Sequence, residues 1–424
     1  MTTTMHRPRS LWRHRDFLTY WVGDTVSSLG TQVTFVALPL VALLTLDVTT
    51  RELGVLRFAE YLPFLALTLL FGVWADRRRR RPLMIAVHVI RGALVAIVPV
   101  LALFGIVRFP VLVAVAFAVG TCTALFEVCW LSYVPSLVPS DRLVDAIGKV
   151  ATSHSAAEVA GPALGGLLVQ LATAPFALIV DAVSYLFAAA SLVIVRHREP
   201  DPVDPAKASQ TRTNMLAELG DGLRFAFRQP YIRATAFCAA QANFFGLLTE
   251  TVFLQYAVRE LQLRPGLLGL VLSTVGAGGI LGAAFANGII TRFPVGRVYV
   301  TARLVSGGGV LLLPLAGGST TTAVATCMAS FFIWQAALAN SNVVNASLRQ
   351  AMTPEHLRGR MNASVRTLVF GALPLGGLAG GLFGDLIGLR AALWLGAIGY
   401  TASVVPILLS PLPRLRTVPT MGDR

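Results

Sequence analysis

The stretch Asp76-Arg77-Arg78-Arg79-Arg80-Arg81-Pro82 separates two long apolar windows, Leu53 to Ala75 and Leu83 to Gly105. A helix needs about 20 apolar residues to cross the hydrocarbon layer of a membrane, so each window is long enough to form one span. Basic loops are retained on the cytoplasmic side of membrane proteins. This stretch therefore predicts two membrane-spanning helices joined by a short cytoplasmic loop.

The composition of the whole chain agrees with this prediction. Of its 424 residues, 55% are hydrophobic and only 13% are charged, against about 25% charged residues in an ordinary soluble domain. Too few polar side chains remain to cover a soluble surface, which excludes a soluble enzyme, a nucleic-acid-binding domain and a disulfide scaffold. The net charge of +14 is then explained by basic loops at the cytoplasmic face, with no nucleic acid as a partner.

Further windows of the same length run along the chain and bring the predicted number of spans to twelve. Those in the first half are Phe17 to Thr45, Pro110 to Ser132, Leu143 to Ala172 and Ala174 to Val195. Those in the second half are Ile232 to Ala257, Gly266 to Thr291, Val298 to Gly317, Thr320 to Asn345, Asn362 to Leu386 and Leu389 to Leu409. We therefore expect a multi-pass protein of the cell membrane.

The 35 Lys and Arg residues are divided unequally between alternate loops. Most of them fall in the set of loops that includes both chain ends, and Arg91 lies within a window. The opposite set of loops holds only Arg51, Arg57, Arg108, Arg259, Arg264 and Arg390. The positive-inside rule then places both termini in the cytoplasm, which an even number of spans permits.

One long hydrophilic connection divides the spans into two sets of six. Residues 1–195 and 231–424 are expected to form the two bundles, and residues 196–230 a cytoplasmic linker with an amphipathic helix near Met215 to Phe227. The halves also echo each other, because Gly72 in the second window has a counterpart in Gly282 of the eighth. We predict an all-α membrane protein with 12 transmembrane helices in two pseudo-symmetric six-helix bundles.

The loop after the second window carries a recognisable pattern. Gly72-Val-Trp-Ala75-Asp76-Arg77, followed by Arg80 and Arg81, resembles the Gly-x-x-x-Asp-Arg-x-Gly-Arg-Arg signature of the major facilitator superfamily. Arg79 stands where that family usually has Gly, which would ease a tight turn. The resemblance implies that Asp76 caps the eleventh span near Asn362 and locks the outward-open state. The alternative is a solvated Arg-rich loop.

The fifth window carries a second pattern, which resembles the antiporter motif of the drug-efflux members of this superfamily. Its members here are Gly148, Ala157, Gly161, Pro162, Gly165 and Gly166, with Ala157 in place of one Gly. Small residues let helices approach closely, and Pro bends a span, so a pivot between the halves is one interpretation. Ordinary small-residue packing is the other.

Across most of its length the chain resembles efflux permeases of the enterobactin-exporter and macrolide-efflux branch. The resemblance implies a monomeric, proton-coupled exporter of a small, largely apolar compound, with the proton gradient as energy source and no cofactor. An importer, a lysolipid flippase or a facilitator on the same fold is an alternative. A membrane-embedded enzyme or a receptor is less well supported, because the chain has no metal-binding, catalytic-serine or ATP-binding motif.

Several ionisable residues lie inside the windows, where each costs roughly 2.5 to 3.5 kcal/mol and usually has a partner or a function. Candidates for proton or substrate coupling are Asp24, Glu60, Arg91, Glu127, Glu158, Asp181 and Glu250. Asp24, Arg91 and Glu127 fall at a similar depth and are placed to form an ion-paired cluster. Glu158 lies nearest the middle of the membrane. An unpaired Glu158 or Glu250 is a candidate proton carrier, and structural pairing is the alternative.

Uncharged polar residues also fall inside the seventh and tenth windows. Their amide groups are candidates to line a cavity between the bundles. These residues are Gln241, Asn243, Asn340, Asn342 and Asn345. No cluster of His and Cys at metal-ligand spacing is present in the sequence, and no metal site is predicted.

Overall fold

The computed structural model describes residues 11–197, 199, 220, 224–354 and 358–417, and this part of the chain is almost entirely helical. The first half contains α1 (Arg15–Leu40), α2 (Thr50–Ala66), α3 (Thr68–Asp76), α4 (Arg80–Leu103), α5 (Phe109–Leu137), α6 (Leu143–Ala172) and α7 (Ala174–Ile194). The second half contains α10 (Pro230–Arg259), α11 (Pro265–Arg292), α12 (Val295–Val310), α13 (Thr320–Met352), α14 (Arg358–Ile387), α15 (Leu389–Ala402) and the short α16 (Val405–Leu408).

The prediction of an all-α membrane protein is confirmed. Among the described residues, 11 helical segments are long and apolar enough to cross a membrane. The second predicted span is missing from these because it is divided at Leu67 into α2 and α3, each too short to qualify. With α2 and α3 taken as one broken span, the helices correspond to the twelve predicted windows.

Local chemistry fixes where the second span begins. After Pro39, which cannot donate a helical hydrogen bond, α1 continues as a π-helical turn, Val41–Thr45. Thr49 and Glu52 then form a capping box: the Thr49 hydroxyl accepts from the Glu52 N–H at 3.2 Å, and the Glu52 carboxylate accepts from the Thr49 N–H at 2.8 Å. This cap sets the position along α2 of the residues that face the second half.

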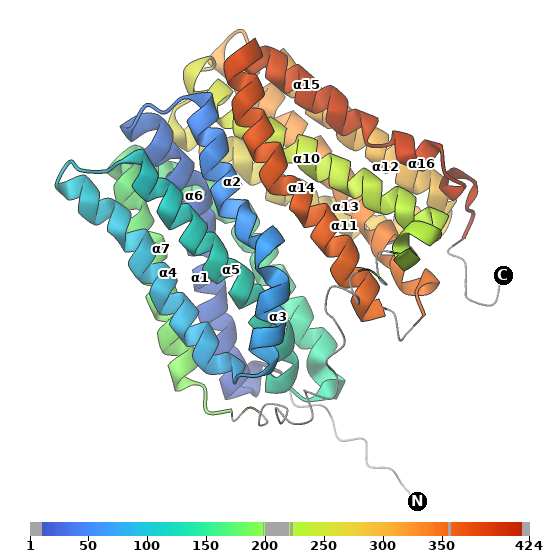
Figure 1. Cartoon of the computed structure of the whole chain (residues 1–424), viewed down its shortest axis with the longest axis horizontal. Coiled ribbons are helices and arrows are strands. Elements are labelled where there is room, and N and C mark those ends of the chain that lie inside the picture. Colours follow the sequence, from blue (N-terminus) through green and yellow to red (C-terminus); the bar gives the residue numbers. More distant parts are fainter. Residues whose placement is uncertain (1–10, 198, 200–219, 221–223, 355–357, 418–424) are drawn as a thin grey trace, which may run out of the picture.

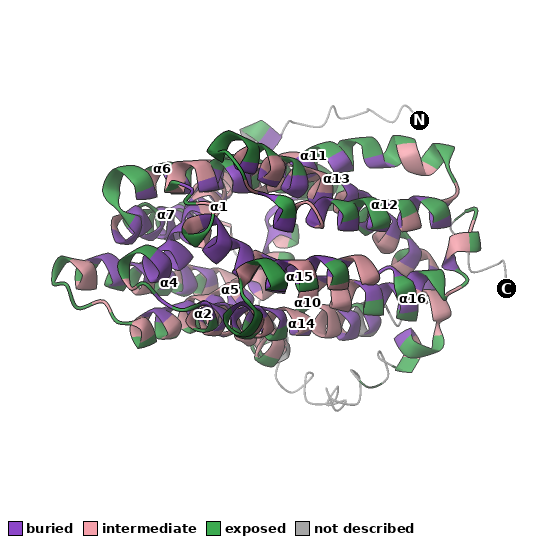
Figure 2. Ribbon diagram, turned by 90° about the horizontal axis from the view of Figure 1, so that it is seen from above, coloured by how far each residue is buried: buried purple, intermediate pink, exposed green. Residues whose placement is uncertain are grey.

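The helices form two bundles. In the first, α1 packs on α6 and α7, α4 on α5 and α7, and α2 on α5; in the second, α10 packs on α14 and α15, and α13 on α11 and α12. The bundles meet mainly through two helix pairs, α2 with α14 and α6 with α11. Buried residues lie between the helices, whereas the exposed residues lie on their outer faces (Figure 2).

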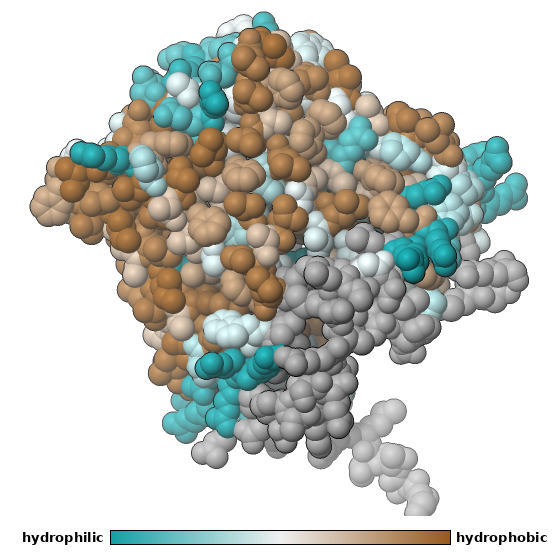
Figure 3. Space-filling model, viewed as in Figure 1, coloured by the Kyte–Doolittle hydropathy of each residue, from teal (hydrophilic) through white to brown (hydrophobic). Residues whose placement is uncertain are grey.

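The two ends of the molecule differ. One end holds the first described residues, the α3–α4 loop and the end of α7, and we call it the terminal side. The opposite end holds the turn before α2 and the α14–α15 turn, and we call it the distal side. The bundles meet at the distal side and diverge toward the terminal side (Figure 1). On the face seen in Figure 3, apolar side chains cover most of the described surface between the ends, as expected of a multi-pass membrane protein.

Two predicted features cannot be compared with the structure. Most of the predicted amphipathic helix in the linker, and the side chain of Asp76, lie outside the described residues. Asp76 itself is the last residue of α3.

Candidate functional site

A cavity of about 470 Å³ lies between the bundles and is lined by both of them. We call it the central cavity. The residues of the first bundle that line it are Gln32, Phe35, Tyr61, Glu158 and Pro162. Those of the second bundle include Asn243, Glu250, Phe331, Trp334, Gln335 and Tyr400. Two of the predicted coupling residues, Glu158 and Glu250, therefore face one space although they belong to different halves of the chain.

A second cavity, of about 640 Å³, adjoins the central cavity. We call it the vestibule. The two share Ala242, Asn243 and Leu338 as lining residues. The polar residues of the vestibule include Asn243, Arg303, Asn342, Asn345, Arg349 and Arg366. Because these side chains come from the parts of α10, α12, α13 and α14 that lie toward the terminal side, the two cavities form a path from the middle of the molecule to that side.

Two pairs of glycines close the distal side. A Cβ atom on Gly166 of α6 would lie 2.8 Å from the Gly269 Cα of α11. A Cβ atom on Gly54 of α2 would lie 2.7 Å from the Gly381 Cα of α14. Real Cβ atoms do not approach other carbons so closely, so only glycine allows these backbones to meet. The two seams exclude space between the bundles at this end.

An ion-paired group connects the bundles next to these seams. The Arg57 guanidinium, which is 1% exposed, lies 2.8 Å from the Glu60 carboxylate and 3.2 Å from the Glu250 carboxylate. It also packs over the Phe35 ring at 5.1 Å. Arg57 and Glu60 belong to α2, and Glu250 belongs to α10. Arg57 was assigned to a loop from the sequence; it is instead buried inside a span.

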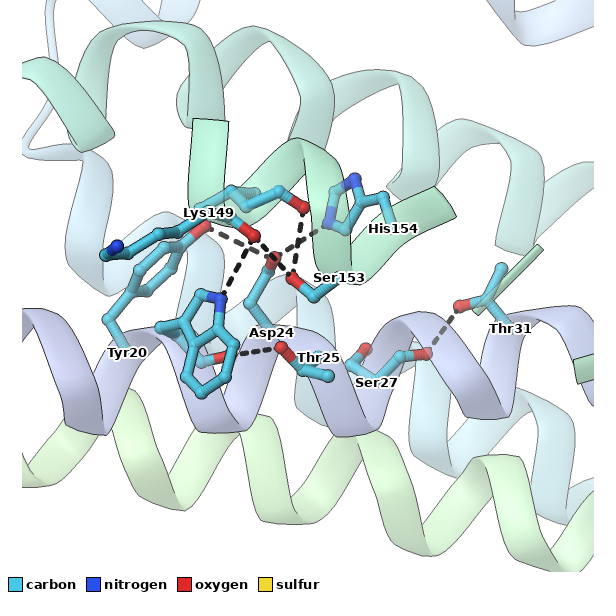
Figure 4. A network of polar contacts seen from close by, with 10 residues as sticks. Tyr20, Asp24, Thr25, Ser27, Thr31, Lys149, Ser153 and His154 are labelled. Carbon is cyan, nitrogen blue, oxygen red and sulfur yellow. Dashed lines mark hydrogen bonds and ion pairs between the residues drawn. The ribbon is translucent and has the colours of Figure 1, made fainter. Parts of the chain in front are cut away.

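Asp24 has a different partner from the one expected. Its carboxylate lies 2.8 Å from His154 Nε2 of α6 and accepts a hydrogen bond from the Tyr20 hydroxyl at 3.2 Å (Figure 4). Glu158 lies one helical turn beyond His154 on α6. Within the described part of the chain, its carboxylate has no hydrogen bond or ion pair, and it is exposed to the central cavity.

The predicted cluster of Asp24, Arg91 and Glu127 is therefore wrong. Glu127 pairs with Arg366 of α14, across the two bundles, and Arg91 stacks on the Tyr185 ring at 4.3 Å. The three residues lie at similar depths in the membrane, but their helices direct them toward different neighbours. Depth along a span can be estimated from sequence; the neighbour that a side chain faces cannot.

Asp181 is fully buried within the first bundle. Its carboxylate accepts hydrogen bonds from the hydroxyls of Thr34 and Ser184, and it lines neither the central cavity nor the vestibule. It joins α7 to α1. The described contacts of Asp181 are thus those of a residue that holds two helices of one bundle together.

The predicted cavity amides fall into two groups. Asn243, Asn342 and Asn345 line the vestibule. The Gln241 amide instead donates to the Gly399 carbonyl at 3.2 Å and joins α10 to α15. The Asn340 amide donates to the Ala336 carbonyl of its own helix at 2.9 Å and lines a separate groove. Three of the five amides thus reach the path between the bundles.

The residues of the antiporter pattern occupy distinct environments on α6. Gly161 and Gly165 pack against Gln32 and Val33 of α1, Pro162 and Gly166 pack against Gly269 of α11, and Ala157 is buried. Gly148 has open space where a side chain would be. The end of the pattern nearer the distal side therefore forms the seam with the second bundle, whereas no described atom lies within 4 Å of the place where a Cβ on Gly148 would be.

The Arg-rich loop is tied to the end of α7. The Glu199 carboxylate accepts from the backbone N–H groups of Arg80 and Arg81 at 2.7 Å each, which caps the start of α4. The Arg81 side chain donates to the carbonyls of Leu192 and Val193, at 2.8 and 2.9 Å. Arg77 is exposed, and Gly72 has open space around its Cα. The described contacts of this loop are thus within the first bundle.

Five charged or titratable residues of the site were missed from the sequence: Arg57, His154, Arg303, Arg349 and Arg366. Arg57 and His154 did have a signal, because each stands one helical turn before a glutamate, Glu60 and Glu158, on the same helix face. Arg303 and Arg366 were counted as loop residues because they lie near the ends of their windows. Among the described residues no group of three His, Cys, Asp or Glu side chains is placed to hold a metal ion.

Comparisons with known proteins agree on one fold and one family. Residues 8–421 match the family described as transmembrane secretion effector. The chain is 25% identical to the multidrug efflux pump Tap of Mycolicibacterium fortuitum, over 91% of this chain and 93% of that protein. It is 24% identical to the uncharacterized MFS-type transporter YfiS of Bacillus subtilis, over 89% of each.

Solved structures support the same fold. A bacterial homologue of the iron transporter ferroportin in its inward-facing state has a TM-score of 0.74 at 17% identity, over 94% of this chain and 99% of that one. The nucleoside transporter NupG has a TM-score of 0.71 at 13% identity, over 93% of this chain and 97% of that one. At these identities the likeness concerns the fold alone.

Proposed function

The chain belongs to the transmembrane secretion effector family of the major facilitator superfamily, and we propose that it exports a small, largely apolar compound by proton antiport. It is a multi-pass membrane transporter and not an enzyme. The observation that carries the proposal is the path formed by the central cavity and the vestibule, which is closed at the distal side by the glycine seams.

The direction of transport is inferred from the side of the membrane to which the vestibule opens. The basic residues gather in the loops of the terminal side, which we place in the cytoplasm by the positive-inside rule. The vestibule then faces the cytoplasm, where an exporter must collect its substrate. Closing the terminal side and opening the seams would release the substrate outside, as alternating access requires.

The chemistry of the central cavity supports an apolar substrate. The aromatic side chains of Phe331, Trp334 and Tyr400 line it from the second bundle, and the Phe331 and Trp334 rings stack with centroids 5.8 Å apart. Aromatic side chains supply large apolar contact areas, and pockets that bind small molecules are lined mainly by such side chains. The relatives that are named multidrug efflux pumps support export as the direction of transport.

Proton coupling is assigned to the carboxylates that face the cavity. Glu158 has no ion-pair partner among the described residues, and Glu250 shares Arg57 with Glu60. A carboxylate that faces a cavity open to water and to substrate can release its proton when the substrate binds and take up a proton when the substrate leaves. We propose a monomer that uses the proton gradient and needs no cofactor.

The export proposal is tested with everted membrane vesicles, whose cytoplasmic face is outside. Three fluorescent probes cover the charge classes: Nile red (neutral), ethidium (cationic) and 8-anilinonaphthalene-1-sulfonate (anionic). We expect at least one to accumulate in vesicles that contain the protein, without ATP, and to leak out when a protonophore is added. Accumulation that persists without a gradient would reject antiport, and no accumulation of any probe would reject export.

Replacing Glu158 with glutamine is expected to uncouple transport. The variant should lose gradient-driven accumulation of the transported probe but keep probe-for-probe exchange, because the cavity remains and only the proton carrier is gone. Exchange is measured as counterflow in proteoliposomes. Glu260→Gln, at an exposed position on the distal side, serves as the control. Full accumulation by Glu158→Gln would move the proton site elsewhere.

A further inference from the structure

Three arginines line the vestibule, and they are neutralised unequally. Arg366 pairs with Glu127. Within the described part of the chain, no carboxylate pairs with Arg303 or Arg349. A charge inside a membrane protein is costly unless it is paired or serves a function. Two unneutralised arginines that line one cavity therefore need an explanation.

Arg303 is held in place without being neutralised. It lies on α12 with 3% of its surface exposed. Its guanidinium donates to the Ser403 hydroxyl at 2.6 Å and to the Tyr400 hydroxyl at 3.3 Å, and it lies over the Tyr400 ring at 5.0 Å. Its Nε is buried without an acceptor. These neutral partners fix the orientation of the side chain, which lines the vestibule, and do not neutralise its positive charge.

Arg349 is still less satisfied. It lies in the last turn of α13 and is half-buried. Its guanidinium makes no hydrogen bond or ion pair with any residue that the structure describes, and its Nε is buried without an acceptor. Asn345, one turn earlier on the same helix, also lines the vestibule, and its amide oxygen is buried without a donor. Unmet hydrogen-bonding groups of this kind are expensive when buried. An oxyanion would accept from the guanidinium groups, whereas the Asn345 oxygen needs a donor, such as water or an N–H or O–H group of the bound molecule.

We propose that Arg303 and Arg349 form an anion subsite that binds a carboxylate or another singly charged oxyanion of the exported compound. The subsite adjoins the central cavity through Asn243, so the apolar body of the same molecule can lie against Trp334. The substrate class is thus an amphipathic anion: a largely apolar molecule with one negative group. This inference rests on the proposed function, whose cargo it specifies.

The subsite is tested by its charge selectivity toward a cysteine placed beside it. Ala346→Cys puts a thiol in the vestibule one turn before Arg349; Gln335→Cys puts one in the central cavity as a matched control. Both are made in full-length protein whose four native cysteines are replaced by alanine. Labelling rates are measured with two methanethiosulfonate reagents, the anionic ethylsulfonate and the cationic ethyltrimethylammonium. The rate of each reagent with the protein thiol is divided by its rate with free 2-mercaptoethanol, which corrects for the reagent's own reactivity.

We expect the ratio of the anionic to the cationic labelling rate at position 346 to be about fivefold to tenfold higher with Arg303 and Arg349 present than without them, the effect of nearby unneutralised charges at an effective dielectric constant near 20. At position 335, which shares its cavity with Glu158 and Glu250, the ratio should be lower. The preference should disappear when Arg303→Gln and Arg349→Gln are combined, and it should survive Arg292→Gln, an exposed arginine outside the vestibule. An equal preference at both positions, a preference that survives the double replacement, or a thiol at 346 that no reagent reaches would each overturn the subsite.

Ligand protection gives a second measurement. 1-Naphthoate should slow the labelling of the 346 thiol by uncharged N-ethylmaleimide, the isosteric 1-naphthamide should not, and the double replacement should remove the difference. Equal protection by both compounds would reject the carboxylate subsite. Since labelling needs no transport, a vesicle assay without export but with charge-selective labelling would reject the exporter and leave the anion site, whereas the reverse result would reject the site alone.

Discussion

Replacing Gly166 with valine is expected to keep the distal side open and to abolish export. A Cβ atom at this position would lie 2.3 Å from the Pro265 carbonyl oxygen and 2.8 Å from the Gly269 Cα, both of which are backbone atoms that cannot rotate away. Overpacking of this kind costs about 1 to 3 kcal/mol. Because the clash exists only in the closed state, a cost of this size shifts the equilibrium between closed and open seams about 5- to 150-fold toward the open state.

The distance between two spin labels placed on opposite bundles at the distal side is measured, and it should be longer in Gly166→Val than in the unchanged protein. Export of the transported probe is the second measurement. Leu171 at the end of α6 and Leu386 at the end of α14 are exposed and belong to different bundles, so cysteines there can carry the labels. Gly148→Val is the matched control, because it lies on the same helix with open space where the new side chain would go. If Gly166→Val keeps the closed distance and full export, the seam does not control access.

The second seam makes the same prediction for Gly54. The number of residues that separates Gly54 from Gly269 also separates Gly166 from Gly381. Gly269 is therefore the counterpart of Gly54 in the second half, and Gly381 is the counterpart of Gly166. The Gly54–Gly381 seam thus repeats the Gly166–Gly269 seam with the two halves exchanged. The same spacing relates the contact of Gly165 with Val33 to that of Gly380 with Leu248. Both seams are therefore copies of one contact, and Gly54→Val should act as Gly166→Val does.

Replacing Arg57 with methionine is expected to have the largest effect on stability. It would leave Glu60 and Glu250 facing each other without the cation that now lies 2.8 and 3.2 Å from their oxygens. Removing one member of a buried ion pair costs about 3 to 5 kcal/mol, because the remaining charge is uncompensated. The apparent unfolding temperature of the protein in detergent should fall accordingly, and transport should be lost with it.

A rescue experiment separates stability from coupling. Adding Glu60→Gln and Glu250→Gln to Arg57→Met removes the unpaired charges and should restore most of the unfolding temperature, as replacement of whole buried ion pairs often does. Gradient-driven transport should stay impaired, since the link between the bundles is gone. Arg51→Gln, an exposed position on the same helix, should change neither. An unaltered unfolding temperature in Arg57→Met would mean that the pair contributes nothing to stability.

The family and the fold could be predicted from residues that are close together in the sequence. Apolar windows report the spans because a helix in lipid must satisfy its backbone internally and present apolar side chains outward. The loop beginning at Gly72 and the Gly-Pro pattern around Gly161 carried the resemblance to the major facilitator superfamily. The break at Leu67 was not predicted, although Pro63 lies inside α2 one helical turn before it; a proline in a membrane span need not end the helix, because neighbouring groups can satisfy the freed backbone.

The sequence by itself determined that this chain is an all-helical membrane transporter of the major facilitator type, because length, hydropathy and short motifs are local properties. Only the tertiary structure decided which charges meet: that Arg57 joins Glu60 to Glu250, that Asp24 pairs with His154, and that Arg349 has no partner among the described residues. The rotation of each helix about its axis sets these contacts. That rotation depends on packing against every neighbour at once, which no single stretch of sequence records.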